Sequence, residues 1–337
     1  MEWQEVLANA RGKMGPCKAC PICDGRACKN TIPGPGAKGV GDVAIRNYAS
    51  WLDIRVNMDT LHANEPISTQ LDLFGHSFAI PVFAGPVGAV KLHYGERFSD
   101  SDYNDILVPA CADAGIAAFV GDGVDATVLE AGTAAIARTG GIGVPTVKPW
   151  DVETVRGKML LAQDCGAFAV AMDVDAAGLP FLQNRQPPAG SKSVEELREI
   201  AEIAGVPFIV KGIMTPQAAE KAARAGVAGI VVSNHGGRVL DSTPSTAEVL
   251  PSIVREVGDD LVILVDGGIR TGLDVFKALA LGARAVIMAR PFVTAVYGGG
   301  AEGVSSLVAK LHNELADTMR MTGAQSIDDI DERLIWH

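Results

Sequence analysis

Short apolar runs alternate with segments of helical periodicity along most of the chain. Eight such runs follow residue 78, and each has glycine, proline or a polar residue at or near its end. They span residues 79–86, 116–123, 142–149, 167–175, 207–213, 229–237, 261–269 and 285–292. Because neighbouring positions in each run are apolar, both faces of the corresponding strand are expected to be buried, as is typical of a parallel sheet.

The segments between these runs predict helices. Apolar residues recur at helical spacing over 194–205, 215–226 and 272–282, and each of these segments ends in glycine. Residues 300–323 are expected to form a closing helix. Eight strand and helix units in series predict the α/β class and a (β/α)8 TIM barrel over residues 79–337.

A doubly wound sheet is the alternative for such an alternating pattern. That fold usually has fewer units and carries a glycine fingerprint after its first strand. Here the glycines gather after the sixth and seventh predicted strands, in 233-SNHGG-237 and 266-DGG-268. This position favours the barrel, whose phosphate sites usually lie near the seventh and eighth strands.

Residues 1–78 precede the barrel and are expected to form an N-terminal extension. Its Gly/Pro-rich piece 33-PGPGAKGVG-41 predicts a loop or lid. Four of the six cysteines, Cys17, Cys20, Cys23 and Cys28, have the spacing C-x2-C-x2-C-x4-C. This run resembles the ligands of an iron–sulfur cluster more than those of a zinc ribbon. Iron–sulfur, zinc, and thiols or disulfides without metal remain open interpretations.

Composition and charge narrow the range of partners. The chain has 337 residues, 48% of them hydrophobic, which is enough for a large core. Its net charge of -11 argues against nucleic acid or an anionic membrane as the main partner, so a small molecule is expected. Since the sequence shows neither a long apolar window nor a secretory signal pattern, no membrane span and a cytoplasmic location are expected.

Charged residues stand at or just after the predicted strand ends, which form the active-site face of a barrel. They are Asp122, Lys148, Asp173, Asp175, Lys211, His235, Arg238, Asp266, Arg270 and Arg290. The stretches 266-DGGIR-270 and 289-ARP-291 combine glycine N–H groups with two arginines, as in phosphate sites. The alternative for Gly267 and Gly268 is a tight turn alone.

Two of these residues point to specific chemistry. Lys211 ends an apolar strand, where an unpaired ammonium is costly, so it is expected to meet an anionic group of a ligand. An ion pair with a barrel aspartate is the alternative. His235 ends the sixth strand in 231-VVSNHGGRVLD-241, beside glycines that give access and Arg238, which can bind an anion. Histidine is a proton acceptor near neutral pH, and Asp173 is expected to orient it.

The stretch 233-SNHGGRVLD-241, with 211-KG-212 and 266-DGGIRTGLDVFKALALGARAV-286, resembles the FMN-dependent α-hydroxy-acid oxidases and dehydrogenases, the group of glycolate oxidase and lactate oxidase. The resemblance extends from about Asn47 to the C-terminus. It implies oxidation of a small 2-hydroxy acid to a 2-oxo acid by a homo-oligomer, a tetramer or larger. The alternatives are a redox-neutral FMN enzyme, similar to the type 2 isopentenyl diphosphate isomerases, or one with another substrate, and a non-catalytic flavin- or phosphate-binding protein.

The resemblance also implies residue roles. His235 would take a substrate proton while a hydride equivalent reaches the flavin, and Asp173 would pair with it. Arg238 would hold the substrate carboxylate, and Lys211 would stabilise the reduced flavin. The residues expected to hold FMN are Ala84, Gly85, Pro86, Asp122, Lys211, Ser233, Asp266, Gly267, Gly268, Arg270, Ala289 and Arg290.

The departures from the family pattern fall on substrate recognition. One family tyrosine is replaced in 145-PTVKPW-150 by Val147 or Lys148, and Lys148 becomes the candidate substrate ligand there. None of the four tyrosines of the chain matches a second family tyrosine. A family arginine falls on Pro180, with Arg185 as the nearest substitute.

Overall fold

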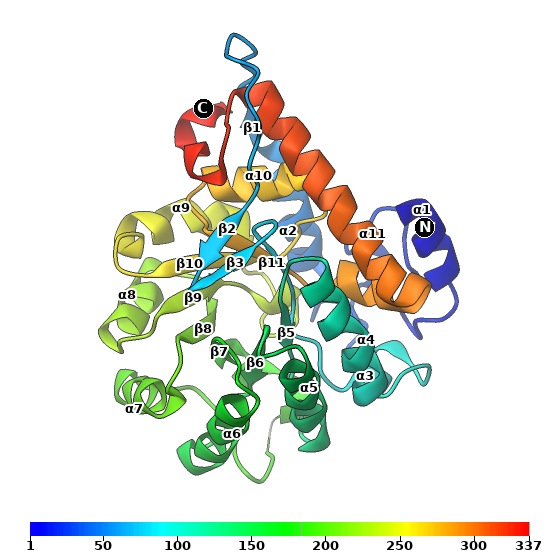
Figure 1. The fold of residues 1–337 in the computed structure, drawn as a ribbon. Helices are drawn as coiled ribbons and strands as arrows, with labels where there is room; N and C mark the ends of the chain where they lie inside the picture. The colour runs from blue at the N-terminus through cyan, green and yellow to red at the C-terminus, as the bar shows by residue number, and fades with distance from the viewer. Residues whose placement is uncertain (183, 337) are drawn as a thin grey trace.

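A closed barrel of eight parallel strands forms the centre of the computed structural model, which describes residues 1–182 and 184–336 (Figure 1). In chain order the strands are β4 (Val82–Ala84), β5 (Ala118–Val120), β6 (Gly143–Val147), β7 (Val170–Asp173), β8 (Phe208–Ile213), β9 (Gly229–Val232), β10 (Val262–Asp266) and β11 (Ala285–Met288). Each strand lies inside one of the eight apolar runs. The predicted (β/α)8 barrel is therefore confirmed.

Helices surround the barrel (Figure 1). They are α4 (Asp100–Asp113), α5 (Thr127–Arg138), α6 (Val152–Asp164), α7 (Val194–Ala204), α8 (Pro216–Arg224), α9 (Thr246–Val257), α10 (Gly272–Ala280) and α11 (Arg290–Thr322). Capping boxes at Ser99, Ser193, Ser245 and Thr271 begin four of them. The closing helix α11 begins ten residues before the predicted start, and that start coincides with a kink at Gly300.

A short hairpin closes the N-terminal end of the barrel. It consists of β2 (Leu71–Leu73) and β3 (His76–Phe78). The ring of Phe78 meets that of Phe83 on β4 edge-on, with centroids 5.0 Å apart, and also lies 5.6 Å from Phe168. This aromatic packing excludes water from that end, so a ligand reaches the barrel from the opposite, C-terminal end.

The N-terminal extension packs on the outside of the barrel and over its C-terminal end. Helix α1 (Trp3–Ala10) lies along α11 in Figure 1. Helix α2 (Asp42–Asp53) contacts α9 and the turn η4 (His235–Gly237), and α3 (Val90–Tyr94) precedes α4. Strand β1 (Arg55–Val56) pairs with β12 (Ile335–Trp336). The other short helices are η1 (Arg26–Cys28), η2 (Val174–Gly178), η3 (Pro180–Leu182), η5 (Ile327–Asp329) and η6 (Glu332–Leu334).

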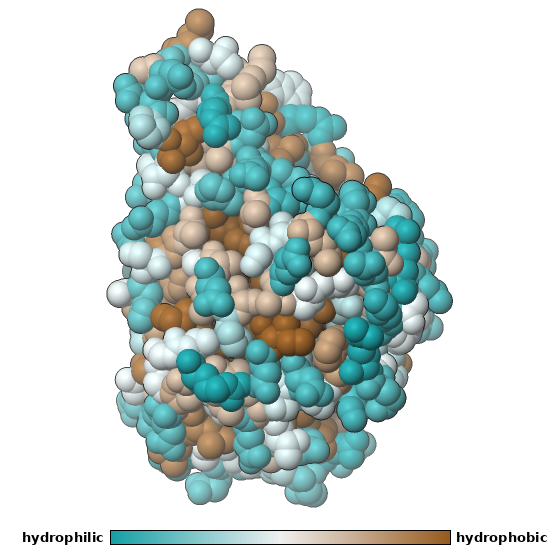
Figure 2. Space-filling model, turned by 45° about the vertical axis from the view of Figure 1, so that its right-hand side comes forward, coloured by the Kyte–Doolittle hydropathy of each residue, from teal (hydrophilic) through white to brown (hydrophobic). Residues whose placement is uncertain are grey.

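The surface mixes polar and apolar residues. On the face shown in Figure 2, hydrophilic side chains surround separate apolar areas. The most exposed large apolar side chain is Leu61 (95%), on the loop after β1, and Met58 and Trp336 are also exposed. Among the described residues, no helix combines the length and apolar character needed to cross a membrane.

Candidate active site

A cavity of about 300 Å³ lies at the C-terminal ends of the barrel strands. Most of the residues predicted from the sequence line it: Gly85, Pro86, Asp122, Lys148, Arg185, Lys211, His235, Arg238, Asp266, Gly267, Gly268, Arg270, Ala289 and Arg290. Ala84, Asp173 and Ser233 are not among the residues that line the cavity. The barrel thus brings together side chains that are more than 200 residues apart in the chain.

His235 is oriented by Asp175, not by Asp173 as the sequence analysis predicted. Nδ1 of His235 lies 3.0 Å from Oδ1 of Asp175, and both side chains are largely buried. The His235 backbone has a φ of 56°, which is uncommon outside glycine, and its N–H donates to Ser233 Oγ at 3.1 Å. One contact therefore holds the backbone of His235, and the other orients its imidazole.

A bulge in β8 makes room for the Asp175 carboxylate. The pairing of β8 with β9 shifts register between Lys211 and Ile213, and Gly212 has a φ of 106°. A Cβ on Gly212 would lie 2.6 Å from Cβ of Asp175 and 2.9 Å from its Oδ1. The glycine of the 211-KG-212 motif is therefore required both by its backbone conformation and by the close approach of Asp175.

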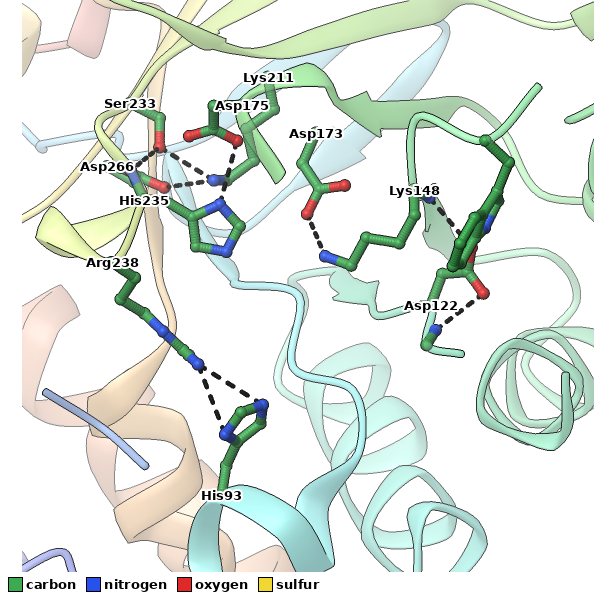
Figure 3. Close-up of polar contacts among 12 residues, drawn as sticks. His93, Asp122, Lys148, Asp173, Asp175, Lys211, Ser233, His235, Arg238 and Asp266 are labelled. Atoms are coloured by element: carbon green, nitrogen blue, oxygen red, sulfur yellow. Dashed lines mark hydrogen bonds and ion pairs between the residues drawn. The ribbon is translucent and has the colours of Figure 1, made fainter. Parts of the chain in front are cut away.

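Asp173 forms a buried ion pair with Lys148. The Lys148 Nζ lies 2.5 Å from Oδ2 of Asp173, and the two side chains are 10% and 2% exposed (Figure 3). Oδ1 of Asp173 has no hydrogen-bond partner. Asp173 lies within 4.8 Å of a His235 ring nitrogen, but its ion pair is with Lys148, from the neighbouring strand end, and the hydrogen bond to His235 comes from Asp175.

The surroundings of His235 keep its imidazole neutral. Burial, followed by the positive charges of Lys211 and Lys148, lowers the pKa of His235 well below 6.5. When Nδ1 donates its proton to Asp175, Nε2 has a free lone pair. In Figure 3 this second nitrogen faces the open space between Lys148 and His93. The geometry suits a general base.

Lys211 has protein partners and also reaches the cavity. Its Nζ lies 2.9 Å from Ser233 Oγ and 3.3 Å from Asp266 Oδ2. Although burial opposes it, the negative charges of Asp266, Asp175 and Asp173 raise the pKa of Lys211, so the side chain is cationic. The ion-pair alternative for Lys211 is thus present in the structure, and the ammonium still lines the cavity.

Arg238 presents a buried positive charge to the cavity. Its NH2 nitrogen lies 3.4 and 3.5 Å from the two ring nitrogens of His93, and its Nε has no partner. Burial and the charge of Arg238 lower the pKa of His93 to about 3, so this imidazole is neutral. Within residues 1–182 and 184–336, the side-chain contacts of Arg238 are with His93 and not with a carboxylate. An anionic ligand can supply the missing partner.

The predicted lid, residues 33–41, is fastened to the 235–241 stretch. Its Lys38 N–H donates to Gly237 O at 2.8 Å, and its Val40 N–H donates to Asp241 Oδ2 at 2.9 Å. Pro35 of the same loop lines the cavity. The loop therefore covers one side of the site and holds the turn that carries His235 and Arg238.

Helix α2 braces the two strand ends that carry the glycine turns. The amides of Asn47 and Asn234 exchange two hydrogen bonds, of 2.7 and 2.9 Å, and Trp51 Nε1 donates to Gly267 O at 2.8 Å. A Cβ on Gly268 would lie 2.0 Å from Asn47 O. The close approach of α2, as well as the positive φ values of Gly267 and Gly268, therefore requires these glycines.

Asp122 has a structural role in this geometry. Its Oδ2 accepts from Trp150 Nε1 at 2.7 Å and from the Lys148 N–H at 3.0 Å. Its Oδ1 accepts from Lys158 Nζ at 2.7 Å and from the Gly123 N–H at 2.8 Å. Four protein donors occupy this carboxylate, so the contacts do not support the prediction that Asp122 binds the cofactor.

The remaining groups of the cavity fit a flavin mononucleotide. Arg290 NH1 and Asp266 Oδ1 are buried without a partner, and they offer a donor for phosphate and an acceptor for ribityl hydroxyls. A Cβ on Gly85 would lie 3.0 Å from Ala289 N, so the backbones at the ends of β4 and β11 pack closely against each other. Because Gly85 has no side chain, a flat ring can approach this backbone. The donor set and the cavity agree with the FMN expected from the sequence.

Three functional contacts were missed by the sequence analysis. The role of Asp175 was missed because it and Asp173 both stand at the end of β7 and only the bulge at Gly212 distinguishes them. His93 and Tyr94, from α3, also line the cavity, although no tyrosine was expected to match the family. The helix that carries them, α3, follows the Ala84-Gly85-Pro86 strand end, but its own residues form no chemical motif in the sequence.

Comparisons with known proteins identify the family. The family model described as FMN-dependent dehydrogenase matches residues 35–187 and 183–337. The chain belongs to this family, whose cofactor is FMN. The match begins some twelve residues before the sequence resemblance was expected to start.

Individual relatives agree with this assignment. The chain is 49% identical over 139 residues to a peroxisomal (S)-2-hydroxyacid oxidase of Arabidopsis thaliana, covering 41% of this chain and 38% of that protein. It is 48% identical over 141 residues to an L-lactate dehydrogenase of Acinetobacter baumannii, covering 42% and 37%. The chain thus spans about two fifths of the length of the curated relatives it matches.

Solved structures match over nearly the whole chain. A mandelate oxidase variant with 2-hydroxy-phenylacetamide superposes with a TM-score of 0.81 at 27% identity, covering 99% of this chain and 97% of the other. A flavocytochrome b2 variant gives a TM-score of 0.78 at 25% identity, covering 90% and 81%. The similarity therefore includes the barrel and most of the N-terminal extension.

Proposed function

We propose that this protein oxidises a small 2-hydroxy acid to the 2-oxo acid with FMN. The observation that supports this most directly is the neutral His235, oriented by Asp175, beside the buried guanidinium of Arg238, whose Nε has no hydrogen-bond partner. A base next to an anion site suits a substrate that carries a hydroxyl group and a carboxylate on neighbouring atoms. The names of the relatives, 2-hydroxyacid oxidase and L-lactate dehydrogenase, agree with this substrate class.

Arg238 binds the substrate carboxylate in this proposal. Its guanidinium has no anionic partner within the described protein, and the neutral His93 beside it adds no competing charge. Lys148 contributes positive potential and remains paired with Asp173, so it acts on the substrate at longer range. Leu92 and Phe181 offer apolar contacts for the substrate side chain.

His235 takes the proton that the substrate loses, at Nε2. Asp175 stabilises the resulting imidazolium through its hydrogen bond to Nδ1. FMN, when bound, supplies the acceptor for the two electrons that leave the substrate. Lys211 would stabilise negative charge on a reduced flavin, and Gly85, Asp266 and Arg290 would hold the ring, the ribityl chain and the phosphate, respectively.

Anaerobic mixing with a panel of 2-hydroxy acids tests the proposal. We expect bleaching of the flavin visible absorption and release of the 2-oxo acid. The variant His235→Gln should keep FMN and lose the bleaching, whereas Cys165→Ala, distant from the cavity, should behave as wild type. Bound FMN that no hydroxy acid bleaches would favour the redox-neutral alternative, and protein that takes up no FMN would exclude both enzymes.

Assembly and location complete the proposal. We propose a homo-oligomer, a tetramer or larger, as the family resemblance implies, and a cytoplasmic location, as expected from the sequence pattern. The exposed side chains of Met58, Leu61 and Trp336 offer apolar area for a subunit contact. Light scattering of the purified protein measures the assembly, and a monomer at micromolar concentration would contradict it.

A further inference from the structure

A second cavity, of about 190 Å³, lies beside the flavin site and is lined by four cysteines of the N-terminal extension. We propose that Cys17, Cys20, Cys23 and Cys28 bind a [4Fe–4S] cluster that carries electrons away from the flavin. The four thiols are free, and all four line this cavity. The other two cysteines, Cys111 and Cys165, are buried elsewhere in the fold.

The cysteine segment has no regular secondary structure and lines the cavity. Residues 17–25 form neither helix nor strand, and they connect α1 to the short η1. The chain turns back at Ala19, with a φ of 44°, and at Gly25, with a φ of 87°. A Cβ on Gly25 would lie 2.9 Å from Cβ of Ala44 on α2, so this turn is packed against the protein. The thiols are therefore held on a fixed loop.

The separation of the sulfurs favours a cluster over a single ion. Four thiolates around zinc lie about 3.8 Å apart, because each Zn–S bond is about 2.3 Å and the site is tetrahedral. In the part of the chain that the structure describes, the one set of three or more candidate ligand atoms within 4.8 Å of one another is Asp173, Asp175 and His235. No three cysteine sulfurs are that close. This wider spacing around one cavity suits a group of several atoms better than a single ion.

Two arginines supply the positive charge that such a cluster needs. A cubane with four thiolate ligands is anionic, and burying it requires cations or hydrogen-bond donors. Arg270 donates from Nε to Cys23 O at 2.9 Å, and its NH2 lies 3.6 Å from Cys23 Sγ. Arg290 also lines the cysteine cavity. The two arginines thus place positive charge beside the four thiols.

The side chains that include these two arginines separate the cysteine cavity from the flavin site. Pro35, Arg270 and Arg290 line both the cysteine cavity and the flavin site. A single layer of side chains therefore lies between the groups that the two cavities would hold. A redox cluster in the cysteine cavity would lie next to the flavin, as electron transfer requires. A structural zinc ion would not need to lie near the flavin.

The electron count follows from the proposed function, on which this role rests. Loss of two protons, one from the hydroxyl group and one from the α-carbon, and of two electrons converts one hydroxy acid into one 2-oxo acid, and the flavin receives the electron pair. A [4Fe–4S] cluster takes up one electron at a time. Two successive transfers through the cluster to a one-electron acceptor protein, whose reduction potential is higher than that of the 2-oxo acid/2-hydroxy acid couple, reoxidise the flavin, and two protons pass to water.

Metal and sulfide analysis of the full chain, purified without oxygen, tests the site. We expect about four iron and four acid-labile sulfide per chain, in addition to FMN, and a paramagnetic signal after dithionite reduction. Cys20→Ala and Cys28→Ala should lose most of the iron and keep FMN, while the matched control Cys165→Ala keeps both. Zinc in place of iron, no uptake of iron and sulfide on reconstitution, or full iron in both variants would overturn the site.

A second measurement separates the relay from the site. Anaerobic hydroxy acid should bleach the flavin and then produce the paramagnetic signal of the reduced cluster. Bleaching without that signal, in protein that contains iron, would overturn the relay alone. If no hydroxy acid bleaches the flavin, the proposed function and the relay both fail, whereas the iron content still decides the cluster site.

Discussion

The Asp175 carboxylate accepts a hydrogen bond from Nδ1 of His235 at 3.0 Å, and Nε2 of that imidazole is left facing the cavity. Asp173, two residues earlier, is neutralised by Lys148 instead. The two aspartates at the end of β7 therefore have different roles: Asp175 positions the base, and Asp173 with Lys148 stabilises the wall behind it.

These different roles predict that removing the charge of Asp175 and removing the charge of Asp173 have unequal effects on flavin reduction. Asp175→Asn should slow flavin reduction by a hydroxy acid by roughly 10²–10⁴-fold, because the imidazolium loses its stabilising carboxylate. Asp173→Asn should have a much smaller effect on the reduction rate. Rapid mixing without oxygen measures both rates, and equal losses in the two variants would contradict the assignment.

The bulge at Gly212 gives a more selective test. Gly212→Ala should displace Asp175 and slow flavin reduction at least tenfold, since the new Cβ would lie 2.6 Å from Cβ of Asp175. Gly226→Ala is the matched control: its φ of 77° is also positive, but no atom lies within 4 Å of the new Cβ. The control should cost about 1 kcal/mol of stability and leave the reduction rate unchanged. A wild-type rate in Gly212→Ala would show that Asp175 does not need this space.

The buried ion pair predicts a stability effect. Lys148→Met should lower the free energy of unfolding by about 3–5 kcal/mol, because the Asp173 carboxylate is left charged and unpaired. The double variant Lys148→Met/Asp173→Leu should recover much of this loss. Denaturant unfolding of the flavin-free protein measures both, and additive losses in the double variant would argue against direct pairing.

The pKa of His235 predicts the pH dependence of the reaction. Folding holds the pKa of His235 well below 6.5, so the neutral imidazole persists as the pH falls through 6.5. The acid limb of the kcat/KM profile should therefore lie below pH 6.5. By linkage, His235 stabilises the fold above pH 6.5, and that contribution is lost as the pH falls toward the lowered pKa. Lys148→Met removes a nearby positive charge and should move the acid limb to higher pH. A limb above 6.5 in wild type, or no movement in the variant, would contradict this electrostatic account.

The sequence predicted the barrel because each strand is a separate apolar run and each helix has its own periodicity and caps. It also located most of the site, since His235, Arg238, Lys211 and Asp266 all stand at strand ends. The partner of His235 depends on a one-residue bulge in another strand, and local sequence carries no signal for it. His93 and Tyr94 reach the cavity through tertiary packing of α3. The predicted start of α11 was late because its first turns are apolar and continue the pattern of β11.

An anaerobic titration of the FMN-loaded protein with a 2-hydroxy acid tests the central claim most directly. The flavin absorption should bleach and one 2-oxo acid should form for each pair of electrons taken up by the protein, in wild type but not in His235→Gln. Unchanged absorption with every hydroxy acid, or equal bleaching in the His235→Gln variant, would contradict the proposed role of this site.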